Sequence, residues 1–320
     1  MLANERFNDP FYSIVLPVYK ESAHIIEVLT SIRTEMKALG VRFELILVDD
    51  GSPDRTWSVL RENAAVFPMM KAIRLSRNFG KEHAMCAGLA AASGDAVIVM
   101  DADGQHPPAL LPKMIQTWHD SRTDVVDAVK THRGKESIFD KSSAGLFYRM
   151  WNKLSGFDLT GASDFKLLSR RAVDAYLQME ERNVFFRGMT AWLGFTSAKV
   201  PFEVVPRGSG TSNWSVLKRV RLAIDGISGF SALPLHFVTM AGAVFLFFSV
   251  IFGIYTLALQ LSGRSITGFA TVILLLLVIG SLLMISLGII GIYLARIYEE
   301  IKRRPRYVVA QTIEPVAENK

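Results

Sequence analysis

The sequence predicts an α/β domain built on a parallel sheet, followed by two helices that form a membrane hairpin. Three observations lead to this prediction. Within the first hundred residues, short apolar runs alternate with segments that have apolar residues at helical spacing, as strands and helices do around a parallel sheet. Residues 226–263 and 265–295 contain no Asp, Glu, Lys or Arg, whereas charged and apolar residues are mixed up to residue 225. Uncharged stretches of this length are typical of membrane spans.

The predicted strands are short apolar runs, and segments with helical periodicity lie between them. Strands are expected at residues 13–19, 43–48, 71–75 and 96–100, and helices at residues 25–39, 55–67 and 83–92. Gly40 stands where a glycine commonly ends a helix. Because the connections between parallel strands run over the faces of a sheet, helices are expected to cover both faces.

Polar side chains follow each predicted strand. The pairs, in chain order, are Tyr19 and Glu21, Asp49 and Asp50, Arg77 and Asn78, and Asp101 and Asp103. In open α/β sheets, ligands bind beyond the carboxyl ends of the strands. The sequence therefore predicts a binding site at this edge of the sheet.

Asp101 and Asp103 form the centre of the predicted site. Two carboxylates spaced i, i+2 at a strand end can hold one hard divalent cation, and Mg²⁺ and Mn²⁺ complete their coordination with water and substrate phosphates. The same spacing occurs in ordinary turns and caps, but the preceding apolar strand and the second acidic turn at Asp49 and Asp50 favour a site. The sequence has no glycine-rich phosphate loop and no Gly-x-Gly-x-x-Gly, which disfavours ATPases and dehydrogenases.

The C-terminal part is expected to cross a membrane twice, at residues 237–259 and 269–295. Each segment exceeds the ~20 residues that a helix needs to cross a bilayer. The link at residues 260–268 carries only Arg264, whereas the second span is followed by Arg296, Lys302, Arg303, Arg304 and Arg306. The positive-inside rule therefore places both ends of the hairpin in the cytoplasm, in a multi-pass protein of the inner (cytoplasmic) membrane. Two buried core helices are the alternative interpretation.

The net charge of +6, from 36 basic and 30 acidic residues, limits the classes of partner. The basic residues form no long run, and no zinc-finger or helix-turn-helix spacing occurs. An anionic membrane surface or a phosphorylated ligand is therefore favoured, and no nucleic-acid partner is expected. The single cysteine, Cys86, excludes an intramolecular disulfide and a cysteine-rich metal site. It lies in an apolar run, which favours a buried structural role.

Motifs along nearly the whole chain resemble family 2 glycosyltransferases, most closely the polyprenyl-phosphate branch of dolichyl-phosphate mannose synthases and bactoprenol glucosyltransferases. They are residues 16–21 (LPVYKE), 48–54 (VDDGSPD), 78–81 (NFGK), 101–108 (DADGQHPP), 161–167 (GASDFKL), 186–189 (FRGM), 207–212 (RGSGTS) and 225–227 (DGI). The resemblance implies a GT-A fold, which is a Rossmann-like domain with a mixed, mainly parallel sheet. It also implies sugar transfer from a nucleotide donor to a polyprenyl phosphate.

The same resemblance implies roles for individual residues. The nucleotide contacts are expected from Pro17, Tyr19, Glu21, Asp50, Lys81, Asp101 and Asp103. Mg²⁺ or Mn²⁺ would be held by Asp101, Asp103 and Gln105. Asp164 and Asp103 are the candidate catalytic residues, with Asp164 near the sugar as a base or as an orienting group.

The acceptor phosphate is assigned by the resemblance to a set of basic and hydroxyl side chains: Arg133, Lys141, Ser143, Arg187 and Arg207. One departure from the family is Asn213, where a Lys is frequent. Lys218 or Arg219 would have to supply the phosphate contact of that Lys.

The expected organisation is a cytoplasmic GT-A catalytic domain at residues 1–212, an interfacial helix or linker at 213–235, the hairpin at 236–296 and a cytoplasmic tail at 297–320. Aromatic and basic residues at 143–154 and 214–230 suit helices in the headgroup layer, or else ordinary amphipathic packing helices. Residues 311–320 are polar and are expected to be disordered. Glycines in the two spans would permit packing between protomers of a homo-oligomer, or would simply face lipid.

The expected reaction is an inverting single displacement from UDP-glucose to undecaprenyl phosphate. Galactose, N-acetylhexosamines, mannose and an aminoarabinose remain open as the sugar. A processive polysaccharide synthase is one alternative, but its usual Gln-x-x-Arg-Trp motif does not occur in this sequence. A nucleotide-binding membrane scaffold without turnover is another, although such a scaffold is expected to lose a metal carboxylate.

Overall fold

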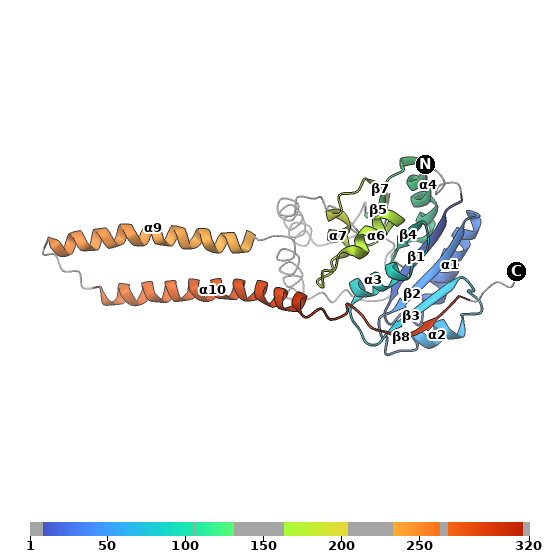
Figure 1. Ribbon diagram of the computed structural model, residues 1–320, viewed down its shortest axis with the longest axis horizontal. Helices are drawn as coiled ribbons and strands as arrows, with labels where there is room; N and C mark the ends of the chain where they lie inside the picture. Colours follow the sequence, from blue (N-terminus) through green and yellow to red (C-terminus); the bar gives the residue numbers. More distant parts are fainter. Residues whose placement is uncertain (1–8, 105, 131–162, 204–232, 263–267, 316–320) are drawn as a thin grey trace. The chain divides into compact units, whose positions relative to one another are not determined.

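The computed structural model describes residues 9–104, 106–130, 163–203, 233–262 and 268–315. They belong to two compact units. The first unit is a sheet domain that includes residues up to 203 and the C-terminal residues from Arg304 onward, and the second contains two long helices (Figure 1). The boundary expected at residue 212 and the interfacial segments at 143–154 and 214–230 lie outside the described residues.

The sheet domain has eight strands in the order β7-β5-β6-β4-β1-β2-β3-β8. Its first four strands in the chain are β1 (Phe11–Val18), β2 (Arg42–Asp49), β3 (Met70–Leu75) and β4 (Ala96–Val99). They pair in parallel, β4 with β1, β1 with β2 and β2 with β3. All four were predicted from the sequence, with boundaries that differ by at most two residues.

The remaining strands make the sheet mixed. They are β5 (Val125–Lys130), β6 (Lys166–Ser169), β7 (Ser197–Phe202) and β8 (Val309–Ile313). β6 is antiparallel to both β4 and β5, and β8 is antiparallel to β3. The apolar periodicity alone indicated a parallel sheet, and this was incomplete. The mixed, mainly parallel sheet implied by the family resemblance is confirmed.

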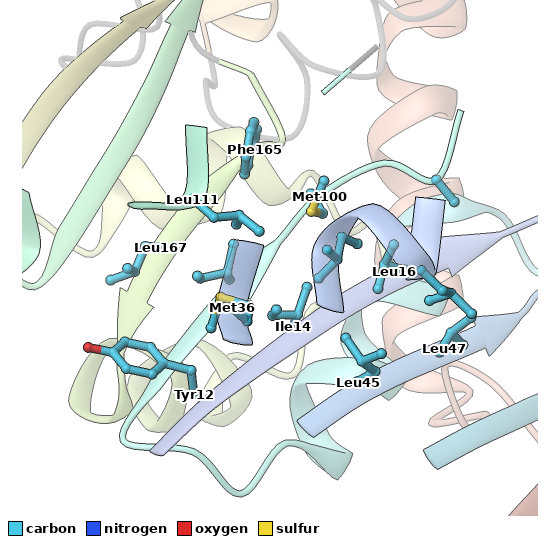
Figure 2. Close-up of a cluster of buried hydrophobic side chains, with 14 of the residues drawn as sticks. Tyr12, Ile14, Leu16, Met36, Leu45, Leu47, Met100, Leu111, Phe165 and Leu167 are labelled. Atoms are coloured by element: carbon cyan, nitrogen blue, oxygen red, sulfur yellow. The ribbon is translucent and has the colours of Figure 1, made fainter. Parts of the chain in front are cut away.

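Helices cover both faces of the sheet, as predicted. α1 (Ile25–Ala38), α2 (Thr56–Glu62) and α4 (Leu111–Ser121) share one apolar core with Tyr12, Ile14 and Leu16 of β1 (Figure 2). A 3₁₀ turn, η2 (Pro108–Leu110), precedes α4. α3 (Lys81–Ala91) packs on β1 and β2. A Cβ at Gly88 would collide with Val15, so the glycine permits this close helix–sheet contact.

The antiparallel pairing of β6 with β4 positions the site. Val99 of β4 lies opposite Lys166 of β6. Continuing this register places Asp101, two residues after Val99, across from Asp164, two residues before Lys166. The sheet therefore brings together two carboxylates that are far apart in the sequence. Two further helices, α6 (Arg170–Gln178) and α7 (Phe186–Trp192), follow β6 in the chain.

The C-terminal segment forms strand β8, so the expectation of disorder is wrong for residues 311–313. Gln311 pairs with Arg74 of β3, and the N–H of Ser76 donates to the carbonyl of Val308 at 2.8 Å. Arg306 donates to the main-chain carbonyl of Met179. The sequence did not predict this strand because its hydrogen-bond partners lie on the edge of β3, far away in the chain.

The second unit consists of α9 (Leu233–Leu261) and α10 (Phe269–Ile301). Both are long and apolar enough to cross a membrane, over Leu235–Thr256 and Val278–Ile301, and none of the described residues in those windows is buried. Membrane spans were predicted at residues 237–259 and 269–295, which lie within these two longer helices. Since no described side chain in these windows is buried, the alternative of two core helices has no support in this part of the chain.

Candidate active site

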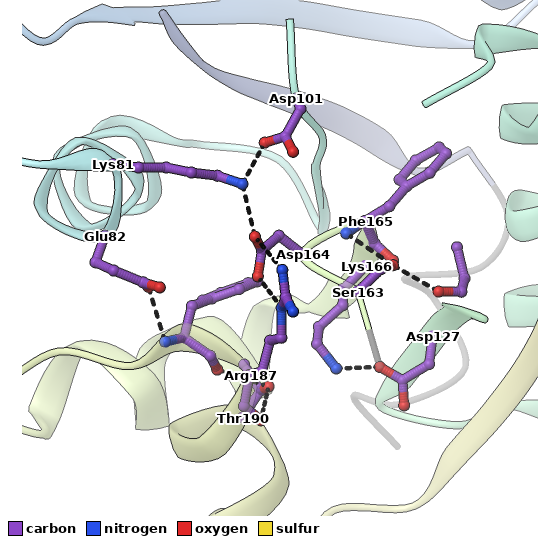
Figure 3. Close-up of polar contacts among 12 residues, drawn as sticks. Lys81, Glu82, Asp101, Asp127, Ser163, Asp164, Phe165, Lys166, Arg187 and Thr190 are labelled. Carbon is purple, nitrogen blue, oxygen red and sulfur yellow. Dashed lines mark hydrogen bonds and ion pairs between the residues drawn. The ribbon is translucent and has the colours of Figure 1, made fainter. Parts of the chain in front are cut away.

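A lysine bridges the two carboxylates that the sheet brings together. Lys81 is the first residue of α3, and its Nζ lies 2.6 Å from Oδ1 of Asp101 and 2.6 Å from Oδ2 of Asp164 (Figure 3). Burial by itself would lower the pKa of Lys81, but the negative charges of Asp164 and Asp101 outweigh it and raise the pKa above its ordinary value. The bridging ammonium is therefore charged at neutral pH.

Arg187, on helix α7, binds the same Asp164 carboxylate. It is the second residue of α7, and its Nε and one terminal nitrogen donate to Oδ1 and Oδ2 of Asp164 at 2.6 and 2.9 Å. Burial of Asp164 tends to raise the pKa of its carboxyl, but Arg187 and Lys81 hold that pKa below the usual range. Asp164 is thus an ionised carboxylate in a fixed orientation, and a weak base in this arrangement.

Glu82 holds the start of α7, and with it Arg187. The N–H of Phe186 donates to Oε2 of Glu82 at 2.8 Å. Burial, and next the charge of Asp164, raise the pKa of Glu82 to about 7. The sequence did not single out Glu82, because a carboxylate in the first turn of α3 is already explained by the helix dipole.

His106 has a structural role beside the acidic motif. Its Nδ1 accepts the N–H of Asp101 at 2.9 Å, and its ring stacks on Phe165 at a centroid distance of 4.9 Å. An acceptor Nδ1 requires the proton on Nε2 when the ring is neutral. The sequence left open whether His106 contacts the metal or makes a structural hydrogen bond, and the described contacts favour the second. The imidazole fixes the backbone at which the acidic motif begins.

The carboxylates of Asp101 and Asp103 fit a divalent cation that takes most of its ligands from elsewhere. Both follow the end of β4, and both are partly exposed. The third predicted ligand, Gln105, lies outside the described residues, among which no group of three or more acidic, His or Cys residues is arranged to hold a metal ion. Mg²⁺ and Mn²⁺ commonly bind to one or two carboxylates and complete their shell with phosphate oxygens and water. Asp101 and Asp103 supply the two carboxylates that such a coordination shell requires.

The loops after β1 and β2 are tied together at the predicted nucleoside end of the site. The N–H of Lys20 donates to Oγ of Ser52 at 3.0 Å, and the N–H of Glu21 donates to Oγ1 of Thr56 at 3.1 Å. Tyr19 in this loop is exposed. Pro17, Tyr19 and Glu21 therefore lie at the carboxyl edge of the sheet, as their motif implied.

The carboxylate of Asp50 accepts hydrogen bonds from the loop that precedes α3. Its two carboxylate oxygens accept the N–H groups of Phe79 and Gly80 at 2.7 and 2.9 Å. Burial raises the pKa of Asp50, while these two hydrogen bonds act in the opposite direction. These contacts hold the start of α3, and therefore Lys81, in place. A direct contact between Asp50 and a nucleoside stays a prediction.

A second buried ion pair lies beside the site and was not anticipated. Lys166 is buried and its ammonium pairs with the carboxylate of Asp127 (Figure 3). The two residues are partners in the β5–β6 register. Alternation along a strand could have indicated that Lys166 points inward, but its partner is 39 residues away in the sequence.

Four of the five predicted acceptor residues lie outside the described residues: Arg133, Lys141, Ser143 and Arg207. Asn213 and its proposed substitutes, Lys218 and Arg219, lie outside them as well. The fifth, Arg187, binds Asp164. Of the predicted set, the structure thus brings together Lys81, Asp101, Asp164 and Arg187.

A family model for glycosyl transferase family 2 matches residues 13–177, which include most of β1, all of β2 to β6, and Lys81, Asp101 and Asp164 of this network. The chain belongs to this family. Among its relatives, the uncharacterized glycosyltransferase YkcC of Bacillus subtilis (strain 168) is 36% identical over 303 residues, covering 94% of each chain. The SfII prophage-derived bactoprenol glucosyl transferase of Shigella flexneri is 32% identical over 302 residues, covering 94% of this chain and 97% of the relative.

A solved structure of this glycosyltransferase fold superposes on the sheet domain. Mannosyltransferase PcManGT from Pyrobaculum calidifontis, in complex with GDP-Man and Mn²⁺, matches with a TM-score of 0.50 at 18% identity. The match covers 68% of this chain and 63% of that chain. At this identity the match shows the shared fold. The enzyme is therefore a GT-A glycosyltransferase with two candidate membrane-spanning helices.

Proposed function

We propose that the enzyme transfers glucose from UDP-glucose to undecaprenyl or another polyprenyl phosphate at the cytoplasmic face of the inner membrane, with inversion. The observation that carries the proposal is a similarity that extends over both units. The Shigella flexneri relative named for bactoprenol glucosyl transfer aligns over 94% of the chain, so the membrane hairpin is included with the catalytic domain. A soluble acceptor would leave the hairpin without a function.

The chemistry of the acceptor matches the state of Asp164. A phosphate monoester has a second pKa of about 6 and is largely dianionic at pH 7, so it attacks without a strong general base. Asp164 carries two cationic partners that lower its pKa, which makes it a weak base. Its role in the proposal is to orient the sugar or the acceptor, through a carboxylate that Arg187 holds in a fixed position.

The displacement is a single step. An oxygen of the lipid phosphate forms a bond to the anomeric carbon as the bond from that carbon to the nucleoside diphosphate breaks. A divalent cation, Mg²⁺ or Mn²⁺, held by Asp101 and Asp103, would neutralise the negative charge of the leaving group. Arg133, Lys141, Ser143 and Arg207 are the proposed contacts of the acceptor phosphate, where planar guanidinium groups can bind phosphate with two hydrogen bonds.

The proposal explains why the enzyme has a membrane hairpin. A polyprenyl chain leaves the bilayer only at a cost of ~0.8 kcal/mol for each buried CH₂ group. The enzyme must therefore work where the phosphate lies, at the headgroup layer. α9 and α10 would anchor the catalytic domain there.

The test uses purified full-length enzyme in detergent, undecaprenyl phosphate and a panel of radiolabelled nucleotide sugars. Label should enter the organic phase from UDP-glucose, in the presence of Mg²⁺ or Mn²⁺ but not of EDTA, and NMR of the product should show the inverted anomer. Asp101→Asn should abolish transfer, whereas the matched control Asp174→Asn, on the exposed surface of α6, should not change it. If label enters the lipid from another nucleotide sugar instead, only the identity of the transferred sugar in the proposal is wrong. Label in a polymer, or no lipid product from any donor, would refute the proposal.

A further inference from the structure

Lys81 occupies the acidic centre as an internal cation. Its Nζ lies at 2.6 Å from an oxygen of Asp101 and at the same distance from an oxygen of Asp164 (Figure 3). Asp101 is one of the two carboxylates proposed to hold the divalent cation. In the structure, one of its two oxygens therefore already binds a positive charge that belongs to the protein.

The two cations cannot both keep close contact with that carboxylate oxygen without strong mutual repulsion. A divalent cation that binds Oδ1 of Asp101 would lie close to the ammonium of Lys81, and like charges a few ångströms apart disfavour one another. Binding of the metal ion must therefore move the lysine. The side chain of lysine suits such a movement, because a flexible stem carries a compact ammonium with three donors.

The neighbouring contacts allow Lys81 to be replaced by a metal ion at Asp101 through movement of side chains alone. The N–H of Asp101 is held by Nδ1 of His106, so the backbone of Asp101 can stay in place while its carboxylate changes partners. Arg187 binds both oxygens of Asp164 and keeps that carboxylate oriented when the lysine moves. Asp50 fixes the N–H groups of the two residues before Lys81, which anchors the base of the side chain.

We propose that Lys81 is the internal counter-ion of the metal-free site, which bridges Asp101 and Asp164 until a divalent cation takes Asp101 and leaves the lysine on Asp164. The inference rests on the proposed function only in placing the metal ion at Asp101 and Asp103. It assigns Lys81 a defined energetic effect. The lysine weakens metal binding in the absence of donor, and a nucleoside diphosphate, which brings its own negative charge, restores it.

The test measures Mn²⁺ binding to the full-length enzyme without nucleotide, by the EPR signal of free Mn²⁺. Lys81→Met removes the charge and keeps the length of the side chain, and it should bind Mn²⁺ roughly tenfold more tightly than the wild type, as expected when one nearby like charge is removed. Lys81→Gln is the second neutral variant, in case the first does not fold. Lys81→Arg keeps the charge and should bind as weakly as the wild type. The exposed Lys113→Met, on α4, is the matched control and should leave binding unchanged.

The outcomes separate this inference from the proposed function. Equal Mn²⁺ affinity in the wild type and both neutral variants overturns the counter-ion role, even if sugar transfer and its metal dependence stand. Tighter binding in the neutral variants supports the role, whichever sugar or acceptor the enzyme uses. If no variant binds Mn²⁺, with or without UDP, the metal site itself is refuted, and the inference with it.

Discussion

Replacing Asp164 by Asn tests the ion network at its centre. The substitution keeps the shape of the side chain but removes the charge that Lys81 and Arg187 share. One oxygen becomes an amide nitrogen, which donates and cannot accept. At least one of the hydrogen bonds at 2.6 and 2.9 Å from Arg187, or the one at 2.6 Å from Lys81, is therefore lost, and two cations remain next to each other.

The expected loss of stability follows from the geometry. Removing one partner of a buried ion pair costs about 3–5 kcal/mol, and Asp164 is almost completely buried. Arg187 and Lys81, however, have side chains that are 33% and 39% exposed, so water can solvate both cations after the substitution. This discount lowers the expected cost to about 2–3 kcal/mol. In a domain of this size, the melting temperature should fall by roughly 4–10 °C.

The dependence on pH provides a second signature. Because the folded-state pKa of Asp164 is below its unfolded value, its contribution to stability is fully present above the unfolded pKa and is lost as the pH falls through the folded pKa. The difference between wild type and Asp164→Asn should therefore shrink below about pH 4.

The assay is thermal unfolding of the detergent-solubilised proteins, monitored by tryptophan fluorescence, together with the transfer assay. Turnover should fall by about 100-fold, because the carboxylate that orients the reacting groups is misplaced. The control is Asp174→Asn, whose ion pair with Arg170 at 3.7 Å lies on the surface and should contribute less than about 1 kcal/mol. A variant as stable as the wild type would refute the network as a stabilising element, and full turnover would remove Asp164 from the mechanism.

Three further predictions concern other parts of the sheet domain. The pKa of Glu82 is raised to about 7 in the folded protein, so its ionisation destabilises the fold as the pH rises from about 4.5 to 7. Relative to Glu82→Gln, the wild type should lose up to a few kcal/mol between pH 5 and 8, and parallel melting curves at all pH values would contradict this. Gly51→Ala should destabilise the sheet domain by more than about 1 kcal/mol in denaturant unfolding, because Gly51 has a φ of +64° and the new Cβ would lie 2.5 Å from the backbone of Arg77. An unchanged unfolding midpoint would contradict this prediction. Truncation after Arg304 removes β8 and leaves β3 as an open edge, so the shortened enzyme should melt at lower temperature and aggregate more during gel filtration; unaltered melting would show that β8 contributes no stability.

The local patterns of the sequence were sufficient for much of the architecture. Apolar runs predicted β1 to β4, helical spacing predicted α1 and α3, and the long uncharged segments predicted α9 and α10. The predicted second helix was too long, since α2 ends at Glu62 instead of residue 67. These elements follow from the sequence because periodicity and the absence of charge are properties of neighbouring residues.

The arrangement of the site depends on contacts between residues that are distant in the chain. Lys81 and Asp164 are 83 positions apart, and Glu82 and Phe186 are 104 apart. No local pattern couples such residues, so their motifs indicated a common site but not that the lysine bridges two carboxylates.

The same reason explains one alternative that the sequence left open and one expectation that was wrong. The motif alone was compatible with a metal contact of His106. Only the fold places its Nδ1 where it accepts the N–H of Asp101. Gln311 and Thr312 are polar and exposed, and residues 311–313 form a strand because β3 leaves unpaired main-chain groups beside them. The sequence alone predicted β1 to β4, the helices between them and the two long C-terminal helices, and it indicated a metal-binding role for the acidic motif. The tertiary structure decided which charges meet, because antiparallel pairing of β6 with β4 sets Asp164 opposite Asp101.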